Sequence, residues 1–278
     1  MSLIQAILPI ATSSREHSTY DIERASLMLA TLDKRLQSKD PLIVHIVSPR
    51  DDLLKIRSTF PLFSNLTLKY VDESSLFELP IPKINGTYIQ QLVKLYSFKI
   101  VGSPHVLTLD ADLVFCRGFS LEDLVIDGKA NSWTSPSLEH PHWWKGSSQI
   151  LRKEFDLEKL RFYLAVTPNV LSIDILKSLS RSIESDYNEP LEAVLFSRLN
   201  GWTEYTLYSL YAESHSLAEL YHCLDAGRPA LVDRFGSVWN DEQASNLGVF
   251  LHREPNGICR VYQSNSYVSI DALTDFYT

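Results

Sequence analysis

Short apolar runs alternate with helical patterns along the first third of the chain. Residues 3–10 and 42–47 are almost continuous apolar runs, the pattern of strands buried on both faces of a parallel sheet. Between them, residues 20–36 carry apolar side chains at helical spacing. A helical pattern at 51–60 and an apolar run at 66–71 repeat this order. The order βαβαβ predicts an α/β fold with a mostly parallel central sheet flanked by helices.

The clearest helical pattern covers residues 86–101, where apolar side chains recur on one face. The sequence Gly-Ser-Pro at 102–104 ends this helix, and the apolar run 106–109 returns to the sheet. Such a Rossmann-like sheet binds ligands beyond the carboxyl ends of its strands. We therefore expect the functional site just after residue 109.

The second half of the chain has a less regular pattern. Predicted strands lie at 131–135, 161–166, 230–232 and 249–251, and predicted helices at 172–183, 189–199 and 203–214. A predicted loop carries the sequence His140-Pro-His-Trp-Trp-Lys145, whose aromatic side chains can close over a sugar pocket or only pack a lid. The chain contains no Gly- or Ser-rich linker and no internal repeat, so we expect one domain over residues 1–278.

Composition excludes several classes of protein. With 45% hydrophobic residues among 278, the chain can bury a large core. The formal net charge of -8 argues against binding to nucleic acid or to an anionic membrane surface.

Cysteine usage and the N-terminal sequence bear on the compartment. The three cysteines, Cys116, Cys223 and Cys259, are widely spaced, which argues against a disulfide framework or a zinc site and fits a reducing compartment. The first residues lack the basic start of a signal peptide, and no window is apolar enough for a transmembrane span. These features predict a cytoplasmic protein.

Two carboxylates follow the apolar run that precedes residue 110. In the sequence Val-Leu-Thr-Leu-Asp110-Ala-Asp112-Leu-Val-Phe, the aspartates are two residues apart, so in extended geometry both side chains point the same way. Hard cations such as Mn²⁺ or Mg²⁺ take such oxygen ligands and keep positions open for phosphate. The alternative is a pair of surface aspartates in a turn, but both flanks are apolar.

This segment carries a family resemblance. The run Tyr-Ile-Gln-Gln-Leu-Val-Lys-Leu at 88–95, followed by the Asp-Ala-Asp segment, resembles the GT-A glycosyltransferases with a DxD motif. The resemblance is strongest to the retaining family-eight enzymes and related bacterial glycosyltransferase-like families. It is close over residues 86–125 and loose in the later part of the chain.

The resemblance implies a single GT-A domain, with a nucleotide-sugar-binding half at 1–125 and an acceptor-binding half at 126–278. Asp110 and Asp112 would bind Mn²⁺ (or Mg²⁺) and the donor diphosphate, with Asp112 also taking part in catalysis. The implied donor is a nucleotide-diphosphate sugar, with a UDP-sugar favoured. The implied acceptor is a glycan, a lipid-linked molecule or a small hydroxyl compound, in glycan or polysaccharide synthesis.

Further donor-binding residues follow from position. Lys94 lies off the core face of its helix, where relatives place a basic residue against the DxD loop or donor, although a solvated lysine fits equally well. Gln91, with Gln90, shares that polar face and can bind sugar hydroxyls. Thr12 and Tyr20 follow the first strand, where such folds hold the base and ribose, but helix capping or packing also explains them.

Two late residues are candidates for the metal site and the acceptor site. His252 ends an apolar run, as does the late metal-binding histidine of family-eight enzymes, yet the Gly- and Lys-containing context of that family is missing. Glu204 follows Gly201, Trp202 and Thr203, and can act as a base toward the acceptor or only complement the helix dipole after a Thr203 N-cap. Trp202 is a candidate stacking platform for a sugar.

Other functions share parts of this pattern. A DxD phosphohydrolase of the haloacid-dehalogenase type places its motif on the first strand, usually before Gly-Thr, whereas here the motif follows three strands. A nucleotidyltransferase of similar fold usually has a Gly-rich, basic loop after the first strand, and Ala-Thr-Ser-Ser at 11–14 is not one. A catalytically inactive nucleotide-sugar-binding protein of the same fold stays open.

Overall fold

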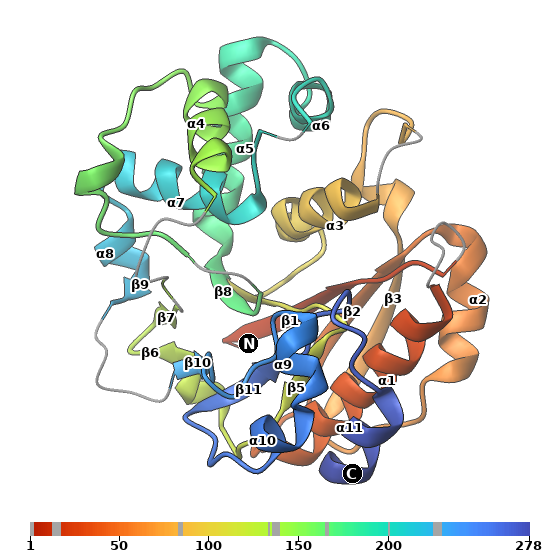
Figure 1. The fold of residues 1–278 in the computed structure, drawn as a ribbon. Helices are drawn as coiled ribbons and strands as arrows, with labels where there is room; N and C mark the ends of the chain where they lie inside the picture. Colours follow the sequence, from red (N-terminus) through yellow and green to blue (C-terminus); the bar gives the residue numbers. More distant parts are fainter. Residues whose placement is uncertain are drawn as a thin grey trace.

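The computed structural model describes residues 3–12, 18–82, 86–132, 134, 140–164, 167–199, 201–224 and 230–278. For residues 18–20 it describes the backbone but not the side chains. Its centre is a five-stranded sheet with the order β3-β2-β1-β4-β8 (Figure 1). The strands are β1 (Ile4–Pro9), β2 (Leu42–Ser48), β3 (Leu66–Asp72), β4 (His105–Thr108) and β8 (Asn169–Ser172). The first four are parallel, and β8 pairs antiparallel with β4. The predicted mostly parallel sheet is therefore confirmed.

Helices cover both faces of this sheet. On one face, α1 (Ser18–Arg35) and α2 (Arg50–Thr59) bury side chains such as Leu29 and Ile56 against Leu8 and Ile46. On the other face lie α3 (Gly86–Leu95), α5 (Ile173–Tyr187), α6 (Leu191–Phe196) and α7 (Glu204–Ser214). The core thus has two layers, because alternate residues of each strand face opposite sides.

The remaining helices are short or peripheral. They are α4 (Pro141–Ile150), which packs on α7, and α8 (Ala218–Tyr221), α9 (Asp241–Ser245), α10 (Leu247–Leu251) and α11 (Ile270–Tyr277). Single 3₁₀ turns occur at Glu73–Leu76, Tyr96–Lys99, Leu121–Asp123 and Leu157–Lys159. Among the helices that the structure describes, none has both the length and the apolar character needed to cross a membrane.

Two small sheets complete the fold. One has the order β10 (Ala230–Val232), β11 (Gly257–Val261), β5 (Leu113–Phe115), and the other contains β6 (Val125–Ile126), β7 (Lys129–Asn131) and β9 (His222–Cys223). Strand β5 follows the carboxylate segment directly and pairs antiparallel with β11. The chain therefore passes from the central sheet to a second sheet at Asp110–Asp112.

Several second-half predictions were wrong. The stretch predicted as a loop at 140–145 begins helix α4, because Pro141 suits the first helical position. The apolar run at 249–251 belongs to helix α10, and short apolar runs do not distinguish a helix from a strand. In the predicted strand 161–166, Leu164 makes an isolated bridge to Thr134, and the strand that joins the central sheet is β8.

Candidate active site

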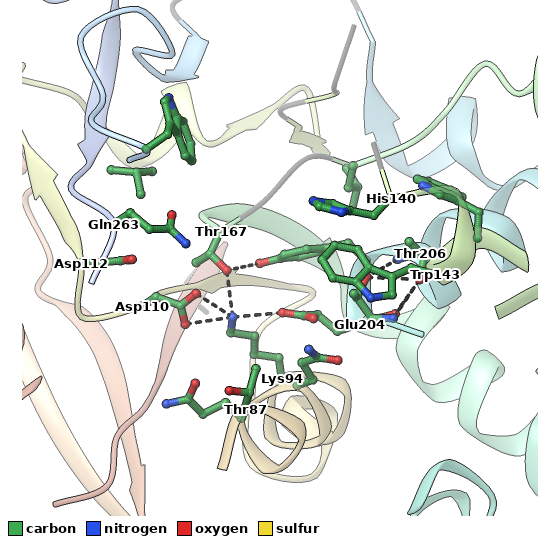
Figure 2. A pocket seen from close by; sticks show the side chains of 18 of the residues that line it. Thr87, Lys94, Asp110, Asp112, His140, Trp143, Thr167, Glu204, Thr206 and Gln263 are labelled. Carbon is green, nitrogen blue, oxygen red and sulfur yellow. Dashed lines mark hydrogen bonds and ion pairs between the residues drawn. The ribbon is translucent and has the colours of Figure 1, made fainter. Parts of the chain in front are cut away.

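A cavity of about 520 Å³ opens beyond the carboxyl end of β4 (Figure 2). It lies where the sheet order reverses, since β2 and β3 extend from one side of β1 and β4 from the other. Helix α3, the segment after β4, the beginnings of α4 and α7, and the ends of β10 and β11 contribute its walls. The lining includes Thr87, Gln90, Gln91, Lys94, Asp110, Asp112, His140, Trp143, Trp144, Leu164, Thr167, Thr203, Glu204, Tyr205, Thr206, Arg234, Trp239, Val261 and Gln263.

Lys94 lies at the centre of the polar contacts of this cavity. Its Nζ lies 2.9 Å and 3.0 Å from the two carboxylate oxygens of Asp110 and 3.0 Å from Oε1 of Glu204. It also donates a hydrogen bond of 2.8 Å to Thr167 Oγ1. The side chain is buried, so the alternative of a solvated lysine was wrong.

The two carboxylates keep this buried lysine charged. Burial alone would lower the pKa of Lys94, but the charges of Asp110 and Glu204 raise the pKa well above its ordinary value. The ammonium group therefore links an acidic residue after β4 with an acidic residue at the start of α7. Figure 2 shows it between them.

Tyr205 and two threonines form a hydrogen-bonded network next to Lys94. The Tyr205 hydroxyl lies 2.7 Å from Thr108 Oγ1 and 2.8 Å from Thr167 Oγ1, and all three side chains are buried. Thr108 in turn donates to the backbone carbonyl of Asn169 in β8. This network fixes the side chains beside the ammonium group relative to the central sheet.

Asp112 has a strongly perturbed environment. Burial and the neighbouring charge of Asp110 raise the pKa of the Asp112 carboxyl to about 7, against the opposing effects of Arg24 and Lys94. The Arg24 guanidinium is buried and donates to the backbone carbonyls of Tyr262 and Val268. The Tyr262 amide donates to the Asp112 carbonyl, so the segment after β11 holds the backbone of Asp112.

Glu204 is the first residue of α7 and is buried. The predicted N-cap is confirmed, since Thr203 Oγ1 accepts from the Thr206 amide and Thr206 Oγ1 accepts from the Thr203 amide. The Glu204 carboxylate thus lies both at the positive end of a helix and beside Lys94. Both arrangements place positive charge beside this carboxylate.

The aromatic side of the cavity is formed mainly by the start of α4. His140 and Trp143 lie at the start of α4 with their ring centroids 4.1 Å apart, and Trp239 lines the cavity from the segment after β10. Trp202 is different, because it is fully buried, donates to the Leu195 carbonyl and packs near Tyr88. The prediction of Trp202 as a stacking platform was therefore wrong, whereas Trp143 is partly exposed and lines the cavity.

Two predicted residues, Thr12 and His252, do not line the cavity. The Thr12 amide and hydroxyl both bind the Asp52 carboxylate at 2.6 Å, which agrees with the packing alternative. The Tyr20 side chain lies outside the described residues. His252 follows α10, and its ring packs edge-on against Phe276 with centroids 5.4 Å apart.

The described residues include no group of three or more His, Cys, Asp or Glu side chains arranged to hold a metal. His252 is therefore not gathered with the carboxylate pair, because the run before it forms a helix and not a strand. Within the described parts of the chain, Asp110 and Asp112 remain the candidate ligands for a cation.

Sequence reasoning missed several lining residues. Thr167, Arg234, Trp239 and Gln263 come from segments without a recognisable motif, although Asp233-Arg234-Phe-Gly directly after an apolar run was a usable signal for a turn at the end of a strand. Gln91 and Gln90, predicted on the polar face of α3, both line the cavity.

Comparison with known proteins adds a family and a fold. The sequence profile of a family of unknown function, DUF6492, matches residues 1–275. The chain belongs to this family. No protein of curated function matches the chain in sequence.

Among solved structures, this DUF6492 member is similar to mouse xyloside xylosyltransferase 1 in its apo form. The TM-score is 0.57 and the sequence identity 13%, over 96% of this chain and 99% of that chain. At this identity the likeness concerns the fold. The DUF6492 member has a glycosyltransferase-like fold, in which a central, mostly parallel sheet is flanked by helices.

Proposed function

We propose that this protein is a metal-dependent glycosyltransferase that moves a sugar from a nucleotide-diphosphate sugar to a hydroxyl acceptor. The observation that carries the proposal is the pair Asp110 and Asp112, which follows β4 at the reversal of the sheet order and opens into a cavity that also contains Glu204. The similarity in fold to a xylosyltransferase supports the same reaction class. Within this proposal the N-terminal half binds the donor and the C-terminal half binds the acceptor, in the cytoplasm.

The carboxylate pair fits a hard divalent cation. The raised pKa of Asp112 reflects two acidic groups close together in a buried site, and a cation there would relieve their repulsion. Asp110 and Asp112 would hold Mn²⁺ or Mg²⁺, with phosphate oxygens as further ligands. When bound, the ion would neutralise charge that develops on the diphosphate.

In the proposed reaction, an oxygen of the acceptor hydroxyl forms a bond to the anomeric carbon of the donor. The bond from that carbon to the diphosphate oxygen breaks, and the diphosphate leaves with the electron pair. The acceptor proton passes to a carboxylate, for which Glu204 is the candidate because it lines the cavity at the start of α7. The ammonium of Lys94 and the guanidinium of Arg234 supply positive charge in the same cavity.

Gln91, Thr12 and Tyr20, which the sequence predicts to bind the donor, have a smaller role in the proposal. Gln91 would bind a hydroxyl, and Thr12 and Tyr20 stay candidates for the region of the nucleotide after β1. Because the Thr12 amide and hydroxyl are both hydrogen-bonded to Asp52, Thr12 would shape this region by packing and would not donate to the nucleotide. His252 has no role in this proposal.

Calorimetry on the purified protein tests the proposal. UDP and a panel of UDP- and GDP-sugars are titrated with Mn²⁺ and with a chelator, and donor turnover is measured in parallel. We expect binding that needs the metal, and loss of both binding and turnover in Asp110→Asn and Asp112→Asn. Asp127→Asn is the matched control, since Asp127 is exposed in a turn outside the cavity. Full turnover in either cavity variant, or in excess chelator, would falsify the mechanism.

The Lys94 contact favours a second candidate function. Because the Asp110 carboxylate is already neutralised by Lys94, the fold can bind a nucleotide sugar without turning it over. Donor binding with neither hydrolysis nor transfer to any tested acceptor would support this binding protein.

A further inference from the structure

We infer that the acceptor is a saccharide, and that it stacks on Trp143 and binds Gln91 on the aromatic side of the cavity. This inference rests on the proposed function and adds the substrate class. It is carried by two features of the cavity lining, Trp143 and Gln91, and it reassigns Gln91 from the donor to the acceptor.

The first feature is the position of Trp143. Its ring is half-buried, lines the cavity and packs against His140, so the indole is held in place while part of it stays accessible. Helix α4 is itself fixed, since a Cβ on Gly146 would lie 1.7 Å from the Gly201 carbonyl oxygen before α7. A rigid aromatic face beside polar groups suits the apolar C–H face of a sugar ring.

The second feature is an unpaired atom on α3. The side-chain oxygen Oε1 of Gln91 is buried and has no hydrogen-bond partner among the described residues, although the residue lines the cavity. A buried polar atom without a partner is costly unless a ligand or water satisfies it. A sugar hydroxyl can donate to the amide oxygen or accept from the amide nitrogen, so it suits this side chain in either orientation.

The rest of the lining argues against a lipid chain in this part of the cavity. Among the described lining residues, only Leu164 and Val261 are aliphatic, whereas hydroxyl and amide side chains occur on α3 and at the start of α7. An alkyl chain would leave these polar groups without partners. The carboxylate of Glu204 on the same side adds a further acceptor for hydroxyl protons.

The test measures saccharide binding without donor and without metal. Cellobiose, lactose, maltose, xylobiose and diacetylchitobiose are titrated separately against the full chain in chelator, by calorimetry and ligand-observed NMR, with 1-hexanol and a Ser-containing peptide for comparison. We expect at least one disaccharide to bind, and neither 1-hexanol nor the peptide to do so. Trp143→Ala should weaken that binding at least about tenfold and Gln91→Leu about fivefold.

Lys145→Ala is the matched control, because Lys145 lies on the same helix, is exposed and does not line the cavity. The affinity of the Lys145→Ala variant for the disaccharide should equal that of the unchanged chain. Circular dichroism on each variant shows whether the fold is kept, and the titrations of the unchanged chain decide the inference even where a variant does not fold.

The outcomes separate this inference from the proposed function. If the protein binds nucleotide with metal but binds no disaccharide, or binds 1-hexanol or the peptide instead, the inference of a saccharide acceptor is wrong. The proposed glycosyltransferase activity is unaffected by that result. Disaccharide binding that Trp143→Ala leaves unchanged also overturns it. Disaccharide binding that depends on Trp143, without any nucleotide binding, supports the sugar site and removes the proposed transferase.

Discussion

The contacts of Lys94 depend on the fold around it and not on its local sequence. A lysine on the polar face of a helix is ordinarily solvated, but here the side chain is buried and contacts Asp110, Thr167 and Glu204. These partners come from three separate parts of the chain. A single side chain therefore couples the carboxylate segment to the beginning of α7.

Another buried residue, His222, makes stability depend on pH. Its ring nitrogens lie 2.5 Å from Ser132 Oγ and 2.8 Å from the Tyr208 hydroxyl, and burial lowers the pKa of the ring to about 3. Above the ordinary histidine pKa of about 6.5, the ring is neutral in both the folded and unfolded states. Below it, the unfolded state takes up a proton that the folded state does not, so acid reduces stability until the pH approaches 3.

We predict that His222→Gln flattens the pH dependence of the unfolding free energy between pH 6.5 and 5. The slope should fall by up to about 1.4 kcal/mol per pH unit, the value for one proton. Urea denaturation at several pH values measures it, with His142→Gln on the surface as control. Burial also lowers the pKa of His45 and His105, so part of the dependence should persist in the variant. An unchanged slope would mean that the His222 ring has the same pKa in the folded and unfolded states.

At the scale of helices and strands, the contact between α4 and α7 shapes the aromatic side of the cavity. Gly146 of α4 lies against Gly201, where a Cβ would approach the carbonyl oxygen to 1.7 Å. The atoms that the added Cβ would meet are backbone atoms of Gly201, so no flexible side chain can move aside. The two elements must therefore separate if any larger residue replaces Gly146.

We predict that Gly146→Ala lowers the unfolding free energy by about 1–3 kcal/mol, despite the better helix propensity of alanine. The same shift should move Trp143 and weaken ligand binding in the cavity. Gly248→Ala in α10 is the control, because no atom lies within 4 Å of its added Cβ. The unfolding free energy of the Gly248→Ala variant should be unchanged or higher by up to about 1 kcal/mol. Equal stabilities of the two variants would contradict the close approach.

The same scale shows what the sequence could predict. The strands β1 to β4 and the helices between them were predicted within a few residues, because long apolar periodicities and a Gly-Ser-Pro stop mark them. The carboxylate pair and the cap at Thr203 followed from local sequence as well. Helix α4, strand β8 and strand β11 were missed, since short elements are stabilised by tertiary contacts and carry little local signal. The partners of Lys94 were unpredictable for the same reason, because Glu204 and Thr167 meet it only through the fold.

At the scale of the whole molecule, Arg260 connects several segments in the last part of the chain. Its guanidinium pairs with Asp233 at 2.8 Å and donates to the carbonyls of Phe250 and Arg253 and to the Tyr277 hydroxyl. The side chain is fully buried in β11. It thereby connects the second sheet to α10, α11 and the segment that carries Arg234 and Trp239 toward the cavity.

We predict that Arg260→Met lowers the unfolding free energy by about 3–5 kcal/mol, because it leaves the Asp233 carboxylate buried without its partner. The double variant Asp233→Leu with Arg260→Met should recover part of that loss, since no buried charge remains. Thermal and urea unfolding measure both. If the single variant were as stable as the unchanged chain, the pair would not be buried as described.

The pairing of β5 with β11 has a consequence for synthesis on the ribosome. Strand β5 emerges directly after Asp112, but its neighbour β11 is made of residues 257–261. The two aspartates therefore gain the support of this second sheet only after residues 257–261 have been synthesised, and competence to hold a ligand cannot arise before that point.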